Sequence, residues 1–201
     1  MKKAFRIVSL VMAMALITCA LVSCGNAATD SSKDGHENEP NSTDLVFYNV
    51  PGDTYAVKAS ETFSLSHVDI PETYHGVAVT RLMPSAFMNK TTLKSVTLPN
   101  SITLIGNMAF AECTALETIT IPNGVTSIEL LSFSNCSNLA SITIPNSVTT
   151  FGDGVFEGCI NLVSIRFEGT VAEWNAIAKG SYWNQSTGDY TVTCTDGEVA
   201  K

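Results

Sequence analysis

Cysteine is the residue type with the most chemical options in this chain. Cys113, Cys136 and Cys159 are evenly spaced along the sequence, and Cys194 lies farther along. Thiols at such intervals can form disulfides, bind zinc or fill a hydrophobic core. Zinc is disfavoured because no CxxC pair or Cys/His pair accompanies them. We favour reduced, buried thiols because free cysteine is among the most buried residue types, although the sequence leaves a disulfide among the four open.

Histidine, aspartate and tryptophan offer fewer options. His67 and His75 accompany no serine or cysteine nucleophile in a recognisable motif, so we interpret them as surface or turn residues. Asp153 lies between two glycines but lacks the alternating carboxylates of a calcium loop. Trp174 and Trp183 could stack on a sugar, but packing at the end of the domain is the favoured interpretation. No catalytic residue, metal site or cofactor site is therefore predicted.

The composition of the 201-residue chain excludes some classes of partner. Hydrophobic residues make up 45% and charged residues 15%, and the formal net charge is −8. Serine and threonine together number 43, more than the 30 charged side chains, so hydroxyl groups supply much of the surface polarity. An acidic chain without a basic stripe is a poor binder of nucleic acid, because that affinity depends on lysine and arginine at the phosphates.

The N-terminal segment, positions 1–23, is predicted to be an export signal. Lys2, Lys3 and Arg6 precede an apolar stretch at residues 7–21, which is shorter than the ~20 residues that a membrane-spanning helix needs. The Leu-Val-Ser-Cys-Gly sequence that ends at residue 25 resembles the bacterial lipobox. This resemblance implies cleavage before Cys24 and lipid attachment to its sulfur. The alternative is an ordinary cleaved signal in which Cys24 is incidental.

From residue 70 onward, the sequence repeats with a 23-residue period. Besides the cysteines, this spacing relates Pro99, Pro122 and Pro145; Phe110, Phe133 and Phe156; Leu116, Leu139 and Leu162; and Ile119, Ile142 and Ile165. An earlier copy has Phe87 and Leu93 in register, with Lys90 at the cysteine position. Columns that agree over three or four copies predict a solenoid of about four coils, because no single repeat can bury its apolar side alone.

Each repeat is expected to contain two short extended pieces and a turn. Residues 116–121 alternate as a half-buried strand, and Pro-Asn-Gly at 122–124 favours a turn. Residues 125–128 are expected to form the second extended piece. A short helical or 3₁₀ turn should then place Phe133 and Cys136 on one inward face.

The Leu-x-x-Ile-x-Ile pattern at residues 116–121 matches the strand of leucine-rich repeats, whose period is about 20–29 residues. More specifically, the unit from Leu98 to Ile121, with Ala109, Phe110 and Cys113, resembles the BspA-like (Treponema pallidum-type) leucine-rich repeat family. The resemblance covers about residues 70–167. It implies a leucine-rich repeat solenoid of the α/β class, with short strands, short helical turns and a role in binding at the cell surface.

Both ends of the repeat region are predicted to be caps. Residues 45–69 alternate like strands, and Tyr74-His75-Gly76 predicts a hairpin in the first coil. Thr170 and Glu173 form a capping box that predicts a helix through Lys179, ended by Gly180. Residues 190–194 alternate and predict a final strand.

The predicted organisation has five parts. Residues 25–44 hold no large apolar side chain, so they cannot bury enough surface to offset the entropy of ordering. The parts are a signal peptide at 1–23, the lipidated Cys24 with a flexible tether at 24–44, an N-terminal cap at 45–69, repeat coils at 70–166, and a C-terminal cap with a helix and a final strand at 167–201.

The outward positions of the predicted strands form two columns of mostly hydroxyl side chains. They are Ser95, Thr97, Thr118, Thr120, Ser141, Thr143, Ser164 and Arg166. Strand propensity alone explains such columns, since threonine suits an exposed strand and cross-strand hydroxyl pairs are mildly stabilising. The functional interpretation is a weakly charged binding face. Few of the side chains that mark binding hot spots are present, so we do not expect high affinity from four coils alone.

We therefore expect a non-catalytic, lipid-anchored, extracytoplasmic module that binds a protein or cell-surface ligand. Adhesion is implied by the family resemblance only, since a fold does not determine a function. The alternative is a structural module that assembles with other envelope proteins, or with itself, through the solenoid edge or cap. An enzyme is the least favoured of the three. No cofactor, metal or nucleic acid is expected, and membrane contact is expected only through the lipid.

Overall fold

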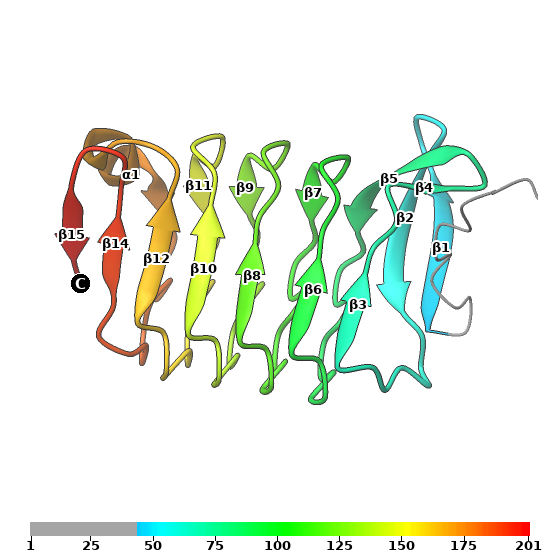
Figure 1. Cartoon of the computed structure of the whole chain (residues 1–201), viewed down its shortest axis with the longest axis horizontal. Coiled ribbons are helices and arrows are strands. Elements are labelled where there is room, and N and C mark those ends of the chain that lie inside the picture. Colours follow the sequence, from blue (N-terminus) through cyan, green and yellow to red (C-terminus); the bar gives the residue numbers. More distant parts are fainter. Residues whose placement is uncertain (1–43) are drawn as a thin grey trace, which may run out of the picture. The chain divides into compact units, whose positions relative to one another are not determined.

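The computed structural model describes residues 44–201, which wind as a solenoid with one sheet on each side (Figure 1). The front sheet contains seven strands and the rear sheet eight. In spatial order the front strands are β15 (Glu198–Ala200), β14 (Thr191–Thr193), β12 (Ser164–Phe167), β10 (Ser141–Ile144), β8 (Thr118–Thr120), β6 (Ser95–Thr97) and β3 (His67–Asp69). The rear strands are β1 (Leu45–Val50), β2 (Thr54–Ala59), β5 (Val77–Leu82), β7 (Leu104–Ile105), β9 (Ser127–Ile128), β11 (Thr150–Phe151) and β13 (Ala178–Lys179), with β4 (Thr73–Tyr74) beside β5.

The repeat sets the register of the front sheet. Ser141 of β10 pairs with Thr118 of β8 and with Ser164 of β12, each one repeat away in sequence. Because the spacing is the same at every residue of a strand, the inward residues Ile119, Ile142 and Ile165 also align and are all buried. Their alternation with outward hydroxyl residues confirms the period-2 pattern predicted from the sequence.

The core lies between the two sheets and is built from the repeated columns. The rings of Phe87, Phe110, Phe133 and Phe156 stack in order, with centroids 5.3–5.7 Å apart. The column of buried leucines and the column of cysteines run beside this stack. The buried core residues of the described part form one cluster between Leu45 and Cys194, inside the compact unit His36–Lys201, so we expect this unit to fold by itself.

The segments that carry the phenylalanines differ from the expected short helices. They are turns in which Leu131 and Asn135 adopt left-handed conformations, with φ of 53° and 58°. Their backbone groups bond to neighbouring coils: the N–H of Phe133 donates to the carbonyl oxygen of Val155 at 3.0 Å. Such bonds between coils alternate with bonds three residues back within the turn, as from the Ser134 N–H to the Leu131 carbonyl oxygen at 3.1 Å, so no regular helix forms.

The solenoid is longer than the four coils expected. Six parallel strands from β3 to β14 follow one another in the front sheet. The additional turns were missed because their spacing departs from the 23-residue period, as between His67 and Ser95 or Ser164 and Thr191. The predicted final strand at 190–194 is present as β14. β15 then folds back antiparallel to it and ends the sheet.

Two predicted details at the ends have different outcomes. The hairpin at Tyr74-His75-Gly76 is confirmed, since β4 pairs antiparallel with β5 and both turn residues have positive φ. The capping box of Thr170 and Glu173 is also present, but α1 (Val171–Ala176) ends before Lys179. Residues 178–179 pair with β11 as the strand β13 instead, because completing the rear sheet satisfies their backbone groups.

The predicted signal peptide, Cys24 and the tether up to residue 43 lie outside the described residues. Within residues 44–201, no helix has the length and apolar character required to cross a membrane.

Candidate functional site

The front sheet presents two straight rows of side chains on its outer surface. Row 1 comprises His67, Ser95, Thr118, Ser141, Ser164 and Thr191. Row 2 comprises Asp69, Thr97, Thr120, Thr143, Arg166 and Thr193. All twelve side chains are exposed or half-buried, and we call them the hydroxyl face. Neighbouring strands lie ~4.8 Å apart and positions i and i+2 are ~7 Å apart, so the face is a regular polar grid.

All eight residues predicted for a binding face lie on this surface. Sequence reasoning missed four further members, namely His67 and Asp69 at one end and Thr191 and Thr193 at the other. A signal for the first pair exists: Ile70-Pro71 follows Asp69 as Leu98-Pro99 follows Thr97. The 28-residue interval from His67 to Ser95 concealed this correspondence.

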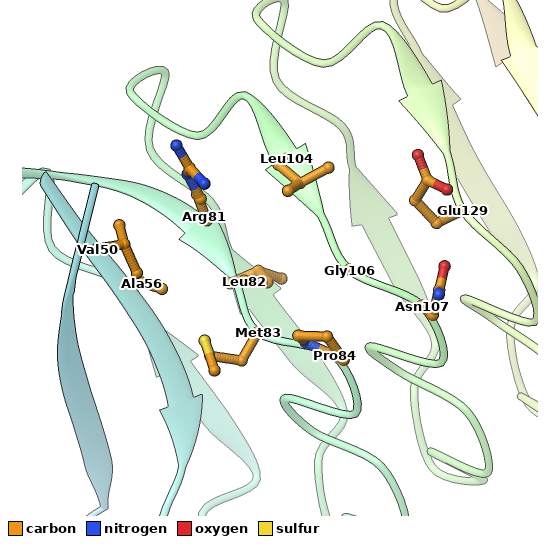
Figure 2. Close-up of a pocket in the computed structure, with 10 residues that line it drawn as sticks. All are labelled: Val50, Ala56, Arg81, Leu82, Met83, Pro84, Leu104, Gly106, Asn107 and Glu129. Carbon is orange, nitrogen blue, oxygen red and sulfur yellow. The ribbon is translucent and has the colours of Figure 1, made fainter. Parts of the chain in front are cut away.

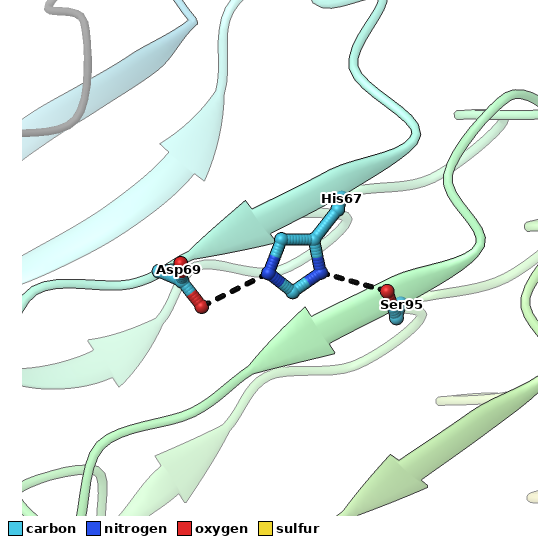
Figure 3. A network of polar contacts seen from close by, with 3 residues as sticks. All are labelled: His67, Asp69 and Ser95. Atoms are coloured by element: carbon cyan, nitrogen blue, oxygen red, sulfur yellow. Dashed lines mark hydrogen bonds and ion pairs between the residues drawn. The ribbon is translucent and has the colours of Figure 1, made fainter.

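Polar contacts on the hydroxyl face are mostly local. Ser141 Oγ donates to Thr118 Oγ1 at 3.2 Å, a contact between adjacent strands. At the end of the sheet, the His67 ring lies between two partners (Figure 3). Its Nδ1 is 2.7 Å from Ser95 Oγ, and its Nε2 is 3.1 Å from Asp69 Oδ1.

This His67 cluster has the residue types of a hydrolase triad without its setting. The side chains of His67 and Asp69 are 52% and 71% exposed, and Ser95 is half-buried, so the cluster is open to water. Catalytic serine needs preorganised oxyanion donors in a site that excludes water. The cluster therefore suits surface recognition better than catalysis. Among the described residues, no group of three or more His, Cys, Asp or Glu could hold a metal ion.

The repeated cysteines are reduced and buried, as predicted. The thiols of Cys113, Cys136 and Cys159 are not in disulfides, and neither is that of Cys194. Each thiol of the column donates to a phenylalanine carbonyl oxygen one coil away; Cys136 Sγ lies 3.1 Å from that of Phe110. Burial raises the pKa of Cys113 and of Cys159 to about 12. These thiols are therefore packing groups with no nucleophilic role at neutral pH.

The two tryptophans pack in the C-terminal cap. Trp174 is buried and meets Phe151 and Phe167 edge-on, with centroids 5.8 and 5.5 Å away. Lys179 Nζ lies 4.8 Å from the Trp174 ring and donates to the Trp174 carbonyl oxygen at 2.7 Å. Burial lowers the pKa of Lys179. The aromatic side chains close the core, which confirms the cap-packing interpretation over a sugar-stacking platform.

A shallow groove of about 330 Å³ opens on the rear sheet, between the β1–β2 hairpin and the first coils (Figure 2). Its lining is Val50, Ala56, Arg81, Leu82, Met83, Pro84, Leu104, Gly106, Asn107 and Glu129. Arg81 and Glu129 lie on either side of Leu104, so the groove has an apolar floor between opposite charges. No sequence pattern predicts this groove, because its lining residues come from separate segments between Val50 and Glu129 that only the fold brings together.

The sequence of the chain matches one known family over most of the described residues. Residues 58–186 correspond to six copies of the BspA-type leucine-rich repeat region. No functionally curated protein matches the chain.

Solved structures with this solenoid come from several bacteria. A leucine-rich repeat protein of T. pallidum has a TM-score of 0.64 and 26% identity, over 73% of this chain and 68% of that one. A leucine-rich cell surface protein of Faecalibacterium prausnitzii has a TM-score of 0.53 and 26% identity, over 67% of this chain and 40% of that one. A leucine-rich repeat protein of Bacteroides capillosus has a TM-score of 0.56 and 28% identity, over 63% of this chain and 96% of that one.

Proposed function

This chain belongs to the BspA-type leucine-rich repeat family, and on that premise we propose that it is a non-catalytic, lipid-anchored adhesion module that binds a protein at the cell surface. The observation that carries the proposal is the hydroxyl face: six coils present two aligned rows of exposed polar side chains. The core residues beneath stabilise the fold, so the outward positions are free to contact a partner.

The chemistry of the hydroxyl face favours a protein ligand. Hydroxyl groups both donate and accept hydrogen bonds, so they can match the polar groups of another protein. Arg166 is the only arginine among the twelve positions, and arginine is enriched at binding hot spots. A face with one such anchor and no aromatic residue supports moderate affinity, which many copies on one surface would strengthen through avidity.

Export and lipid attachment rest on the N-terminal sequence and on the resemblance to a relative that is named a cell surface protein. A single acyl chain binds membranes marginally, so stable anchoring needs more than one chain. The test is a Cys24→Ala variant expressed in the bacterium that naturally produces the chain. We expect it to leave the membrane fraction, and mass spectrometry of the natural protein should find a lipidated N-terminal peptide. A variant that stays membrane-bound would contradict the anchor.

Binding is tested with residues 36–201 immobilised against purified matrix proteins and envelope proteins. Thr118→Lys and Thr143→Lys change the centre of the hydroxyl face and should abolish capture of a specific ligand. The matched controls are Thr126→Lys and Thr149→Lys, two exposed threonines that also lie on adjacent coils but outside the front sheet. Equal loss in both pairs of variants, or retention in both, would contradict the proposed face. Retained capture that depends instead on the caps would favour a structural assembly module.

A further inference from the structure

Row 2 carries two opposite charges: Asp69 stands at one end, and Arg166 stands one strand before the other end, which is Thr193. Asp69 lies on β3 and Arg166 lies on β12, four strand positions apart, or ~19 Å at the spacing of a sheet. Only hydroxyl side chains lie between them in the row. Within the described chain, Arg166 forms no ion pair within 4.0 Å, and the Asp69 carboxylate contacts only the exposed His67. The part of row 2 from β3 to β12 is therefore a polar strip with an acid at one end and a cation without an ion-pair partner at the other.

This pattern is complementary to itself. Two copies can be related by a two-fold axis that lies in the plane of contact, parallel to the strands and above β8. The order of the coils is then reversed in the second copy, and each row faces the same row of that copy. Asp69 then faces Arg166 of a second copy, and Arg166 faces Asp69 of that copy. In the same arrangement, Thr120 meets Thr120 on the axis. The remaining positions pair as Thr97 with Thr143, Thr118 with Thr118, Ser95 with Ser141, and His67 with Ser164.

The strands of the front sheet run side by side in nearly the same direction from β3 to β14, so both rows remain straight (Figure 1). Within row 2, only threonines stand between Asp69 and Arg166, so no large side chain of this row holds two such faces apart. The Asp69–Arg166 pair would form twice in one dimer, once on each side of the axis, which is the signature of an isologous contact. Reversing the order of the coils is essential, since face-to-face copies in the same coil order would keep Asp69 opposite β3 and Arg166 opposite β12, and the two charges would not meet.

We propose that the hydroxyl face binds a second copy of this chain, face to face, with two Asp69–Arg166 ion pairs that fix the register. The inference rests on the proposed function, because it names the partner of the same face. The contact spans five strands, roughly 24 Å, and is two side chains wide. It is therefore smaller than the ~800 Å² per partner of a standard stable interface. The dimer is accordingly weak and reversible, as suits contacts that are repeated many times between surfaces.

The test is sedimentation equilibrium of residues 36–201 over a range of concentrations up to about 1 mM. We expect the natural chain to show a monomer–dimer equilibrium that weakens as salt screens the ion pairs. Asp69→Arg and Arg166→Asp, each alone, place like charges opposite one another and should weaken dimerisation at least 10-fold. An equimolar mixture of these two variants pairs arginine with aspartate at both positions, so dimerisation should return to within about 3-fold of the natural chain.

Matched controls reverse charges outside the hydroxyl face. Arg81→Asp on the rear sheet and Glu61→Arg in the loop after β2 should leave the dimerisation constant unchanged, alone and mixed. Circular dichroism checks that every variant is folded; all four positions are at least partly exposed. A natural chain that stays monomeric at the highest concentration, or a mixture that stays as weak as either variant, overturns the inference.

The outcome also separates this inference from the proposed function. If self-association is absent while a different protein still binds in a manner abolished by Thr118→Lys, the inference fails and the proposed function stands. If neither self-association nor a ligand depends on the face, both fail.

Discussion

The stacked phenylalanines predict a nearest-neighbour pattern of stability along the solenoid. Phe133 is fully buried, and its ring lies 5.3 Å from that of Phe110 and 5.7 Å from that of Phe156, centroid to centroid. Removing a buried phenylalanine costs about 3–5 kcal/mol. Because another phenylalanine ring packs against each face of the Phe133 ring, we expect the stability cost of Phe133→Ala to lie at the upper end of that range. Such a cost approaches the whole free energy of unfolding of many domains.

Substitution by leucine is the version of this experiment that can be measured, because leucine keeps most of the side-chain volume and removes only the ring. Phe133→Leu should lower the free energy of unfolding by roughly 1–3 kcal/mol, since two ring contacts of about 0.5–1.5 kcal/mol each are lost. Phe110→Leu should have a similar effect. The double variant should cost about 1 kcal/mol less than the sum of the two, because both single changes remove the same 110–133 contact.

The control pair is Phe87 and Phe133, which are two coils apart and do not stack on each other. Their leucine variants should be additive within about 0.5 kcal/mol. Urea unfolding of residues 36–201, followed by far-ultraviolet circular dichroism, measures all four corners of each cycle. Equal coupling in the two pairs, or no coupling in the neighbouring pair, would refute the stacking argument.

Three further changes have defined outcomes. Burial raises the pKa of Cys113 and Cys159 from the ordinary 9.0 to about 12; the unfolded chain therefore loses these protons first, and stability should fall as pH rises from 9 toward 12. Urea unfolding should show a free energy of unfolding that is lower at pH 10 than at pH 8 by roughly 1 kcal/mol for each of the two thiols. In Cys113→Ala this difference between the two pH values should be smaller by the share of one thiol. A free energy of unfolding that does not change with pH would contradict the burial argument. Thr170→Ala removes the cap of α1 and should cost about 1 kcal/mol, whereas Thr170→Ser should cost less than half of that. Gly158 has φ of 73°, and a new Cβ there would meet the side-chain oxygen of Asn135. Gly158→Ala should therefore lower the free energy of unfolding by about 1–2 kcal/mol and lower the thermal midpoint, and an unchanged midpoint would exclude strain there.

Regular spacing made the central coils predictable. Phe110, Phe133 and Phe156 recur with the same neighbours in sequence. Assigning the buried positions of one repeat therefore predicts the core residues of all three repeats. The outward rows followed as well, because side chains alternate along a strand and a constant period keeps each row aligned. Even the reduced state of Cys136 was accessible, since it shares the apolar side of its coil with phenylalanine and leucine.

Other features were decided by contacts between coils. The turns before Phe133 have left-handed residues such as Leu131, which has no local preference for that conformation. They are held by hydrogen bonds to the next coil, as from the Leu131 N–H to the Asp153 carbonyl oxygen at 2.9 Å. In the same way, Lys179 leaves the expected helix because its segment completes the rear sheet.

The sequence by itself determined the repeat, the buried columns, and the hydroxyl character of the outward rows. The tertiary structure decided how many coils join and which residues end each row. His67 and Asp69 enter the hydroxyl face through a longer interval than the regular period of the central coils. That entry depends on backbone pairing between β3 and β6, which tolerates a longer connection because lengthening a loop costs little entropy. Only this pairing brings Asp69 into line with Arg166, and with it the charge pattern from which self-recognition is inferred.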